Sequence, residues 1–284
     1  MNRVAFLNNK FVKFNSAKIH IEDRGLQFSD SVYEVVMIFN SQIIDFEFHI
    51  KRLRYSLKEL SINYVVNKKF LKEIFAKLLK KNSIKNGIIY LQITRGIQSR
   101  EHAFKRKLKP TVISYTQKKK FNLPNKNYKG YKAVLFPDIR WARRDIKSTS
   151  LLPNVLASTY AAKKFSYEAI FIHNQKITEA SHSNVWIIKN KKIFTHPSNQ
   201  DILKGITRTV LVNIIKKNNF ILKENFFSLN ILLNADEVFI TSSGSLITPI
   251  VKIENKKIGK GKIGTITKLL AIQLMQFYKN QYKS

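Results

Sequence analysis

Residues 140–158 read RWARRDIKSTSLLPNVLAS, which predicts the end of a strand, a loop and the start of a helix. Pro153 fits the first turn of that helix, where no N–H group is needed. Lys147 lies at the junction, close in sequence to Arg143 and Arg144. Neighbouring cations and partial burial lower the pKa of a lysine, so its amine becomes a nucleophile toward carbonyls. Spacing alone also fits an ordinary surface lysine before a helix.

The C-terminal half around this junction mixes short apolar runs, typical of strands, with longer runs of helical periodicity. Strands are expected over residues 131–141, 167–174, 176–180, 184–190, 192–197, 237–243 and 245–253, and helices over about residues 150–165, 207–218 and 266–279.

The N-terminal half shows a similar mixture. Short β-type runs cover residues 3–8, 11–14 and 17–21, and a later pair of strands is expected over 88–96 and 110–117. Helices are expected over about residues 47–60 and 68–80, where leucines, isoleucines and phenylalanines recur at helical spacing. Residues 30–39 fit either a helix or a strand. These patterns predict an α+β fold.

Domain organisation follows from length and from one linker. A chain of 284 residues favours two domains. The segment QKKKFNLPNKNYKG, with its lysine run, proline and glycine, is the best linker and places a boundary near residues 117–125. We expect a smaller N-terminal α/β domain over 1–120 and a larger C-terminal α/β domain over 121–284 that carries Lys147.

Composition excludes several classes of protein. The 33.1 kDa chain is 44% hydrophobic, which argues against disorder. It has no cysteine, which excludes disulfides, thiolate-bound metals and a cysteine nucleophile, and no metal is expected. No apolar run approaches the roughly 18 residues of a membrane span. The first residues lack the apolar stretch of a signal peptide, so a cytoplasmic location is expected.

The net charge of +33 raises the alternative of a nucleic-acid-binding protein. The lysines recur along the whole chain instead of forming one arm or stripe, which favours a solvated basic surface over a nucleic-acid site. Small anions would still be attracted to such a surface.

Eight segments, in one order, resemble those of D-amino-acid aminotransferases, which are fold-type IV pyridoxal-phosphate enzymes. They are IEDRGLQFSDSVYEVV, HIKRL, TRGIQSREHAF, DIKSTSLLPNVLA, YEAIFI, ITEASHSNVW, ILKGITR and FITSSGSLITPI. The resemblance covers nearly the whole chain. It implies two α/β domains with pyridoxal 5'-phosphate between them, and a homodimer with residues of both chains at each site.

The resemblance also implies roles for the cofactor residues. Lys147 would form the Schiff base with pyridoxal phosphate and shuttle the proton, and Glu179 would face the pyridine nitrogen. A carboxylate there keeps the nitrogen protonated, so the ring can act as an electron sink. The phosphate would be bound by a helix N-terminus, hydroxyl groups and one fixed cation. The residues assigned to cofactor binding besides Glu179 are Arg52, Ser183, Gly205, Ile206, Thr207, Ser242 and Ser243.

Substrate recognition is assigned to Tyr33, Arg100 and His102. A guanidinium beside an imidazole suits a carboxylate, and the resemblance implies that these residues hold the α-carboxylate so that the D hydrogen faces Lys147. The R-x-H-x-F string distinguishes this group from branched-chain L-aminotransferases and aminodeoxychorismate lyases.

Four positions bear on how far the resemblance extends. Ser29 and Ser31 stand where the family has glycines, and a glycine lost from a tight turn costs strain. After Glu179, Ala180 keeps a small residue, whereas His182 replaces a common serine and would enter or crowd the cofactor pocket.

The expected reaction is a ping-pong transamination in which D-alanine and 2-oxoglutarate give pyruvate and D-glutamate, a supply of peptidoglycan precursors. A branched-chain L-aminotransferase and an aminodeoxychorismate lyase stay open as alternatives on the same fold. A nucleic-acid-binding protein is the more distant alternative.

Overall fold

The computed structural model describes residues 3–281. These residues divide into two compact units, one drawn from Met1–Lys120 with Ile146–Ser150 and one from Phe121–Asp145 with Leu151–Ser284. The segment that carries Lys147 therefore groups with the first unit, although the sequence assigned it to the C-terminal domain. Independent domains over 1–120 and 121–284 stay a prediction.

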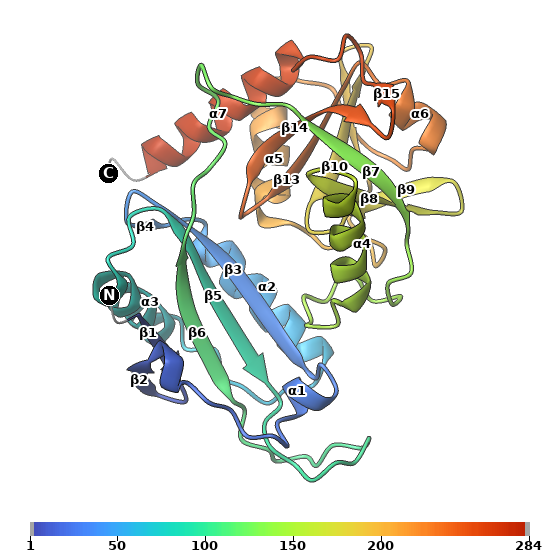
Figure 1. Ribbon diagram of the computed structural model, residues 1–284. Helices are drawn as coiled ribbons and strands as arrows, with labels where there is room; N and C mark the ends of the chain where they lie inside the picture. The colour runs from blue at the N-terminus through green and yellow to red at the C-terminus, as the bar shows by residue number, and fades with distance from the viewer. Residues whose placement is uncertain (1–2, 282–284) are drawn as a thin grey trace. The chain divides into compact units, whose positions relative to one another are not determined.

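The first unit is built on a six-stranded antiparallel sheet in the order β2-β1-β6-β5-β3-β4. Helices α2 (Phe46–Glu59) and α3 (Lys68–Asn82) cover one face of this sheet (Figure 1). The strands are β1 (Val4–Leu7), β2 (Lys10–Lys13), β3 (Ser31–Phe39), β4 (Gln42–Ile43), β5 (Gly87–Thr94) and β6 (Val112–Lys118).

Apolar side chains between this sheet and the two helices form the core of the first unit. Leu53 of α2, Leu71 and Leu78 of α3 and Ile89 of β5 are at most 1% exposed. Burying each such side chain stabilises the fold by roughly 1.5–3 kcal/mol. Asn67 caps α3 by accepting a hydrogen bond from the Phe70 amide. Both expected helices are therefore present.

The structure resolves one ambiguity and corrects one expectation. Residues 31–39 form β3, because their β-branched side chains lie on a sheet between two neighbours. Residues 17–21 are not a strand. They follow a short 3₁₀ turn, η1 (Phe14–Ser16), and Ile19 and Ile21 are 39% and 77% exposed. Alternation of apolar and polar residues predicts a strand only where a partner strand lies alongside.

The second unit is built on a mixed nine-stranded sheet in the order β12-β11-β10-β13-β14-β7-β8-β9, with β15 also paired to β14. Its strands are β7 (Tyr131–Pro137), β8 (Glu168–His173), β9 (Lys176–Ala180), β10 (Asn184–Lys189), β11 (Lys192–Thr195), β12 (Leu222–Glu224), β13 (Glu237–Ser242), β14 (Leu246–Ile253) and β15 (Lys256–Lys257).

Helices pack on this second sheet through small and branched side chains. Helix α4 (Leu152–Lys163) lies on β7 and β8, where Ala157 and Ala161 contact Phe171. Helices α5 (Ile206–Lys217) and α7 (Thr265–Gln281) pack on each other and on β13, and α6 (Leu229–Leu233) packs on β9. The sequence missed α1 (Arg24–Gln27), β4, β12, α6 and β15, which are all five residues or shorter. Among residues 3–281, none of the helices combines the length and the apolar character that crossing a membrane requires.

Candidate active site

Lys147 lies on a short segment that runs antiparallel to β3 in the first unit. The Tyr33 amide donates to the Lys147 carbonyl at 3.0 Å, and the Lys147 amide donates to Ser56 Oγ at 3.1 Å. A bridge between Val32 and Ser148 continues the pairing. The Lys147 ammonium group lies 4.0 Å from the centre of the Tyr33 ring, which is a cation–π contact. The backbone of this segment is therefore fixed on both sides of the lysine.

The two arginines that precede Lys147 do not act as the sequence suggested. Arg143 is paired with Asp145 at 2.9 Å, and Arg144 with Asp201 at 3.2 Å. Their charges are thus offset by neighbouring carboxylates, and the expected crowding of Lys147 by bare cations is not observed.

A buried charged cluster lies beneath Tyr33 on the helix side of the sheet. Glu34 accepts two hydrogen bonds from Arg52, at 2.9 and 2.8 Å, and lies 2.6 Å from His49 Nδ1. Burial alone would raise the pKa of Glu34, but Arg52 and His49 lower it from 4.5 to about 2. Burial lowers the pKa of His49, which favours the neutral imidazole.

This cluster changes how the Arg52 prediction is stated. Arg52 is 9% exposed and its guanidinium is held by Glu34, so any anion that it contacts would meet a fixed, partly neutralised cation. The sequence did not identify Glu34 or His49. The signal was present, because an acid in the apolar run SVYEVVMIF has to find a buried cation.

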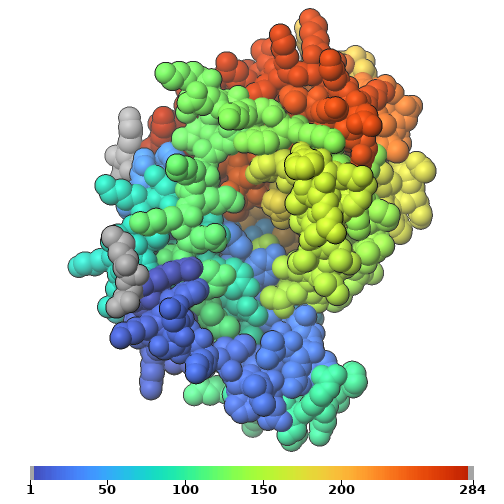
Figure 2. All heavy atoms as spheres, in the orientation of Figure 1, coloured from blue at the N-terminus to red at the C-terminus, as the bar shows by residue number. Residues whose placement is uncertain are grey.

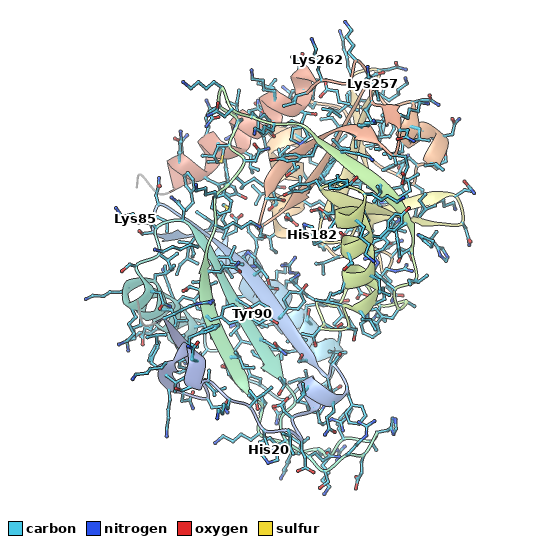
Figure 3. The ribbon with its side chains drawn as sticks, viewed as in Figure 1. His20, Lys85, Tyr90, His182, Lys257 and Lys262 are labelled. Atoms are coloured by element: carbon cyan, nitrogen blue, oxygen red, sulfur yellow. The ribbon has the colours of Figure 1, made fainter. Side chains whose placement is uncertain are left out.

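The other face of the same sheet carries a row of tyrosines. Tyr33 stacks on Tyr90, and Tyr90 on Tyr115, with ring centroids 5.7 and 5.0 Å apart. Figure 3 labels Tyr90 on β5. Burial raises the pKa of Tyr90 well above its usual value, so the hydroxyl stays protonated and donates to Gln92.

Arg100 and His102 are exposed on the loop between β5 and β6. The structure brings both side chains to one ring. The Arg100 guanidinium lies 4.7 Å from the centre of Phe28, and the His102 ring lies 5.5 Å from the same centre. Two donors on one exposed edge can bind one carboxylate.

The serines that replace family glycines have distinct consequences. Ser29 has φ 54°, a left-handed conformation that favours glycine, so the expected strain is present at this position. Ser31 does not share it. Its hydroxyl lies 2.6 Å from Thr149 Oγ1, which also donates to the Ser29 carbonyl at 3.1 Å. These bonds add a side-chain tether between β3 and the Lys147 segment.

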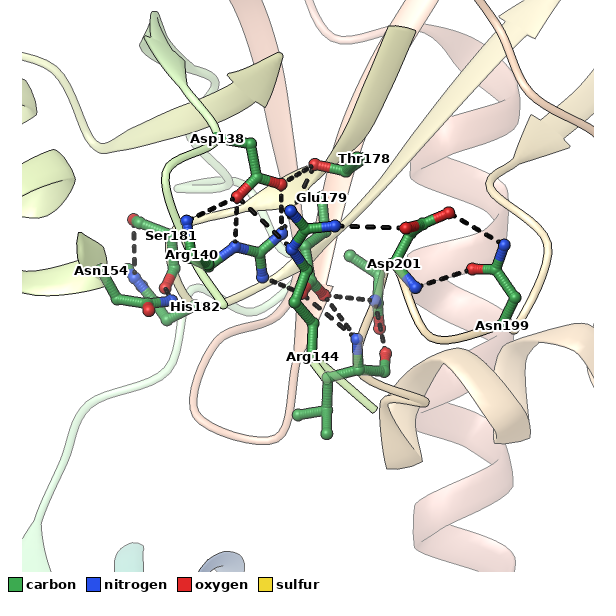
Figure 4. A network of polar contacts seen from close by, with 12 residues as sticks. Asp138, Arg140, Arg144, Asn154, Thr178, Glu179, Ser181, His182, Asn199 and Asp201 are labelled. Atoms are coloured by element: carbon green, nitrogen blue, oxygen red, sulfur yellow. Dashed lines mark hydrogen bonds and ion pairs between the residues drawn. The ribbon is translucent and has the colours of Figure 1, made fainter. Parts of the chain in front are cut away.

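Glu179 lies at the end of β9 in the second unit, within a network of buried polar groups (Figure 4). Arg140 donates a short hydrogen bond to one of its oxygens, Asn184 donates to the other at 3.1 Å, and the Leu203 amide donates to both at 3.2 Å. Arg140 also donates to Asp138 at 2.7 Å. The carboxylate is thus fixed in position.

The charge balance of this network suits a further cation. Burial raises the pKa of Glu179 above its usual value, although Arg140 and the Leu203 amide act in the opposite direction. Asp138 shares the same arginine, and hydrogen bonds from Arg140 and Thr178 lower its pKa despite burial. A protonated ring nitrogen beside Glu179 would favour the charged carboxylate. The residues therefore fit the pyridine end of pyridoxal phosphate. The sequence did not identify Arg140 or Asp138.

The start of α5 fits the phosphate end of that cofactor. Gly205 is the N-cap, and no side chain caps the first turn that Ile206 and Thr207 begin. A Cβ at Gly205 would collide with Asn184 Oδ1, so only glycine lets the chain pass so close to the Glu179 network. Open amides at a helix N-terminus bind phosphate.

The remaining serines are less uniform. Ser242 Oγ lies 2.7 Å from Ser245 Oγ, and Ser243 is half-buried in the same turn. Ser183 donates instead to buried Glu168 at 2.9 Å. His182 lies 3.2 Å from the same carboxylate, and its side chain is 54% exposed. Glu168 therefore holds His182 at the surface. Within residues 3–281, no group of three or more histidines and acids could hold a metal ion.

Residues 31–253 match the family described as Amino-transferase class IV, and the chain belongs to this family of pyridoxal-phosphate-dependent enzymes. The chain is 40% identical over 269 residues to the D-alanine aminotransferase of Staphylococcus aureus (strain MSSA476), which covers 93% of this chain and 94% of the relative.

Two solved structures share its architecture. The branched-chain amino acid aminotransferase of Escherichia coli has a TM-score of 0.88 at 23% identity and covers 95% of this chain and 92% of that one. A branched-chain amino acid aminotransferase from T.th., solved with pyridoxamine 5'-phosphate, has a TM-score of 0.84 at 20% identity and covers 97% and 94%. The predicted fold-type IV architecture with two mixed α/β domains is confirmed.

Proposed function

We propose that this class IV aminotransferase acts on D-amino acids by a ping-pong mechanism, and that D-alanine and 2-oxoglutarate give pyruvate and D-glutamate. The observation that carries the proposal is the similarity over most of the chain to D-alanine aminotransferases. Arg100 and His102 on one ring add support, because they offer a donor pair for an α-carboxylate.

Lys147 is the proposed catalytic residue. Its amine would bind the cofactor covalently, be displaced by the amino group of the substrate, and then move the proton from the substrate Cα to the cofactor carbon. When bound, pyridoxal phosphate supplies the electron sink for the carbanion at Cα. The tethered backbone on each side of Lys147 favours this role, because proton transfer requires a fixed geometry.

The other residues would bind and orient. Glu179 would hold the pyridine nitrogen in its protonated form. The α5 N-terminus from Gly205 to Thr207, with Ser242 and Ser243, would bind the phosphate. Arg52 would contribute to the phosphate site as a cation fixed by Glu34.

Two further assignments belong to this proposal. Tyr33, Arg100 and His102 would hold the substrate carboxylate on the side that exposes the D hydrogen to Lys147. Ser183 would act through Glu168, to which its hydroxyl is bound. We also propose that the chain works as a homodimer.

Reduction with borohydride tests the covalent assignment. We expect the purified protein to be yellow and peptide mapping to find the pyridoxyl group on Lys147. Lys147→Ala should lose the label and lower the rate with D-alanine and 2-oxoglutarate by at least about 1,000-fold, since the proton shuttle is lost.

Lys163→Ala, which removes an exposed lysine of α4, is the matched control and should keep both label and rate. A label on another lysine contradicts the assignment. Preference for L-leucine over D-alanine would favour the branched-chain alternative, and pyruvate release from aminodeoxychorismate without an acceptor would favour the lyase.

A further inference from the structure

The loop between β5 and β6 carries Arg100 and His102 and projects from the first unit (Figures 1 and 2). β5 ends at Thr94 and β6 begins at Val112, and residues 99–107 are all exposed. The loop lies outside the strand pairing, so its conformation depends on the side chains that bind its backbone.

Arg24 of α1 is the buried cation that binds this loop. It is 3% exposed. Its Nη1 donates to the Glu101 carbonyl at 2.6 Å and its Nη2 to the His102 carbonyl at 3.0 Å. These two bonds fix the peptide units that follow Arg100. A guanidinium can fix two carbonyls at once because its donors form a planar fork.

Arg24 is itself held by a charged group. Asp30 accepts from Arg24 Nε at 2.9 Å and from Arg95 at 2.7 and 2.9 Å. Burial alone would raise the pKa of Asp30, but the hydrogen bonds from Arg95 and Arg24 lower it. Asp30 is therefore charged at neutral pH and fixes the direction in which Arg24 reaches the loop.

The Phe28 ring connects Arg24 to the side chains of the loop. The Arg24 guanidinium lies 4.6 Å from the centre of this ring and the Arg100 guanidinium 4.7 Å from it. The His102 ring lies 5.5 Å from the same centre. One aromatic ring thus sets the positions of both predicted carboxylate donors relative to buried Arg24.

We propose that Arg24 is a positioning residue for substrate recognition, which holds the loop so that Arg100 and His102 present their donors together to the α-carboxylate of the substrate. The inference rests on the proposed D-amino-acid transamination and adds the residue that sets its carboxylate site. Arg24 does not itself contact the substrate. A donor pair displaced by about 1 Å would bind a carboxylate poorly, because such contacts depend steeply on geometry.

The test compares two amines on the holoenzyme, with 2-oxoglutarate as acceptor. D-alanine has a carboxylate, and isopropylamine has a methyl group in its place. Arg24→Gln should lower kcat/KM for D-alanine about 10- to 100-fold, mainly through KM, and change that for isopropylamine less than about twofold. Hydrogen exchange of the cofactor-free protein should become faster at the amides of residues 99–104.

Two variants accompany the test. Arg54→Gln is the control, because Arg54 also binds one backbone carbonyl in the first unit, that of Val66, and it should leave both amines unchanged. Phe28→Leu keeps most of the volume, removes the shared ring, and should reproduce the selective loss with D-alanine. It tests the same proposal if Arg24→Gln does not fold.

The outcomes separate this inference from the proposed function. A wild-type enzyme that prefers D-alanine, with Arg24→Gln and Phe28→Leu variants that lose both amines equally or neither, overturns the role of Arg24 alone. A wild-type enzyme that treats D-alanine and isopropylamine alike overturns the carboxylate role of Arg100 and His102, and with it this inference.

Discussion

Glu179 is a buried carboxylate whose donors only partly offset the cost of its burial. If it holds the pyridine nitrogen protonated, removing its charge should weaken the electron sink and leave cofactor binding in place. We expect Glu179→Gln to lower kcat at least about 100-fold, because the electrostatic support of a developing carbanion is lost. Stopped-flow kinetics and the absorbance of the bound cofactor measure the two effects separately.

Asn184→Asp is a useful companion to that variant, since it keeps the size of a side chain that binds Glu179 and reverses the balance of charge around it. A Glu179→Gln enzyme with unchanged kcat would show that this carboxylate does not act on the ring nitrogen.

The site residues differ in how far sequence could identify them. Lys147 and Glu179 lie in strings that resemble a family in order and spacing, so the sequence alone was enough to propose them. Glu34 and Arg140 could not be proposed in this way, because their roles depend on partners at His49 and at Glu179, and a sequence does not show which charges meet. The pairing of Arg143 with Asp145 was missed for the same reason.

At the scale of elements, Glu34 of β3 and the α2 residues Arg52 and His49 form a charged link between sheet and helix. Because the pKa of Glu34 is about 2 when folded and 4.5 ordinarily, the link stabilises the fold fully above pH 4.5. This contribution is lost as the pH falls toward 2. The pKa difference corresponds to about 3 kcal/mol.

We expect urea unfolding at pH 6 and pH 4 to show the start of that loss. The Glu34 contribution should fall by about 1 kcal/mol between these pH values, and the gap between wild type and Glu34→Gln should narrow by the same amount. Glu47→Gln is the control, because Glu47 is exposed on the same helix. A constant gap would contradict the link.

The long elements were predictable and the short ones were not. The helices over 46–59 and 68–82 have apolar faces that a 3.6-residue period reveals. The assignment of residues 31–39 and the error at 17–21 both depended on whether a neighbouring strand was available. A window of sequence does not contain that neighbour, because the partner of β3 is β5, more than 50 residues away.

On the scale of the whole molecule, the net charge and one apolar surface act against each other. The chain carries +33, which repels a second copy. Helix α4 exposes Leu152, Val155 and Leu156 at 69%, 55% and 49%, an apolar face that a second copy could bury. If the proposed homodimer uses this face, salt should strengthen it by screening the repulsion.

Light scattering at about 0.05 M and about 0.5 M salt tests this prediction, and the dimer fraction should rise with salt. Leu156→Glu should lower it at both concentrations. The control is Leu269→Glu on α7, which adds the same charge at a leucine of similar exposure, 41%. A monomer under all conditions would contradict the homodimer, and a dimer that weakens with salt would show that it is held by ion pairs.

The return of residues 146–150 to the first unit limits how this polypeptide can be cut. β4 pairs with β3 only at Ile38 and Phe39, and the Lys147 segment pairs at the opposite end of that strand. A fragment that stops at residue 120 would lack this second cover and leave open backbone groups along β3. The N-terminal half should therefore aggregate when produced alone, and mixing it with the complementary fragment should restore a folded protein only if the loop that bears the lysine can re-enter its place beside the strand.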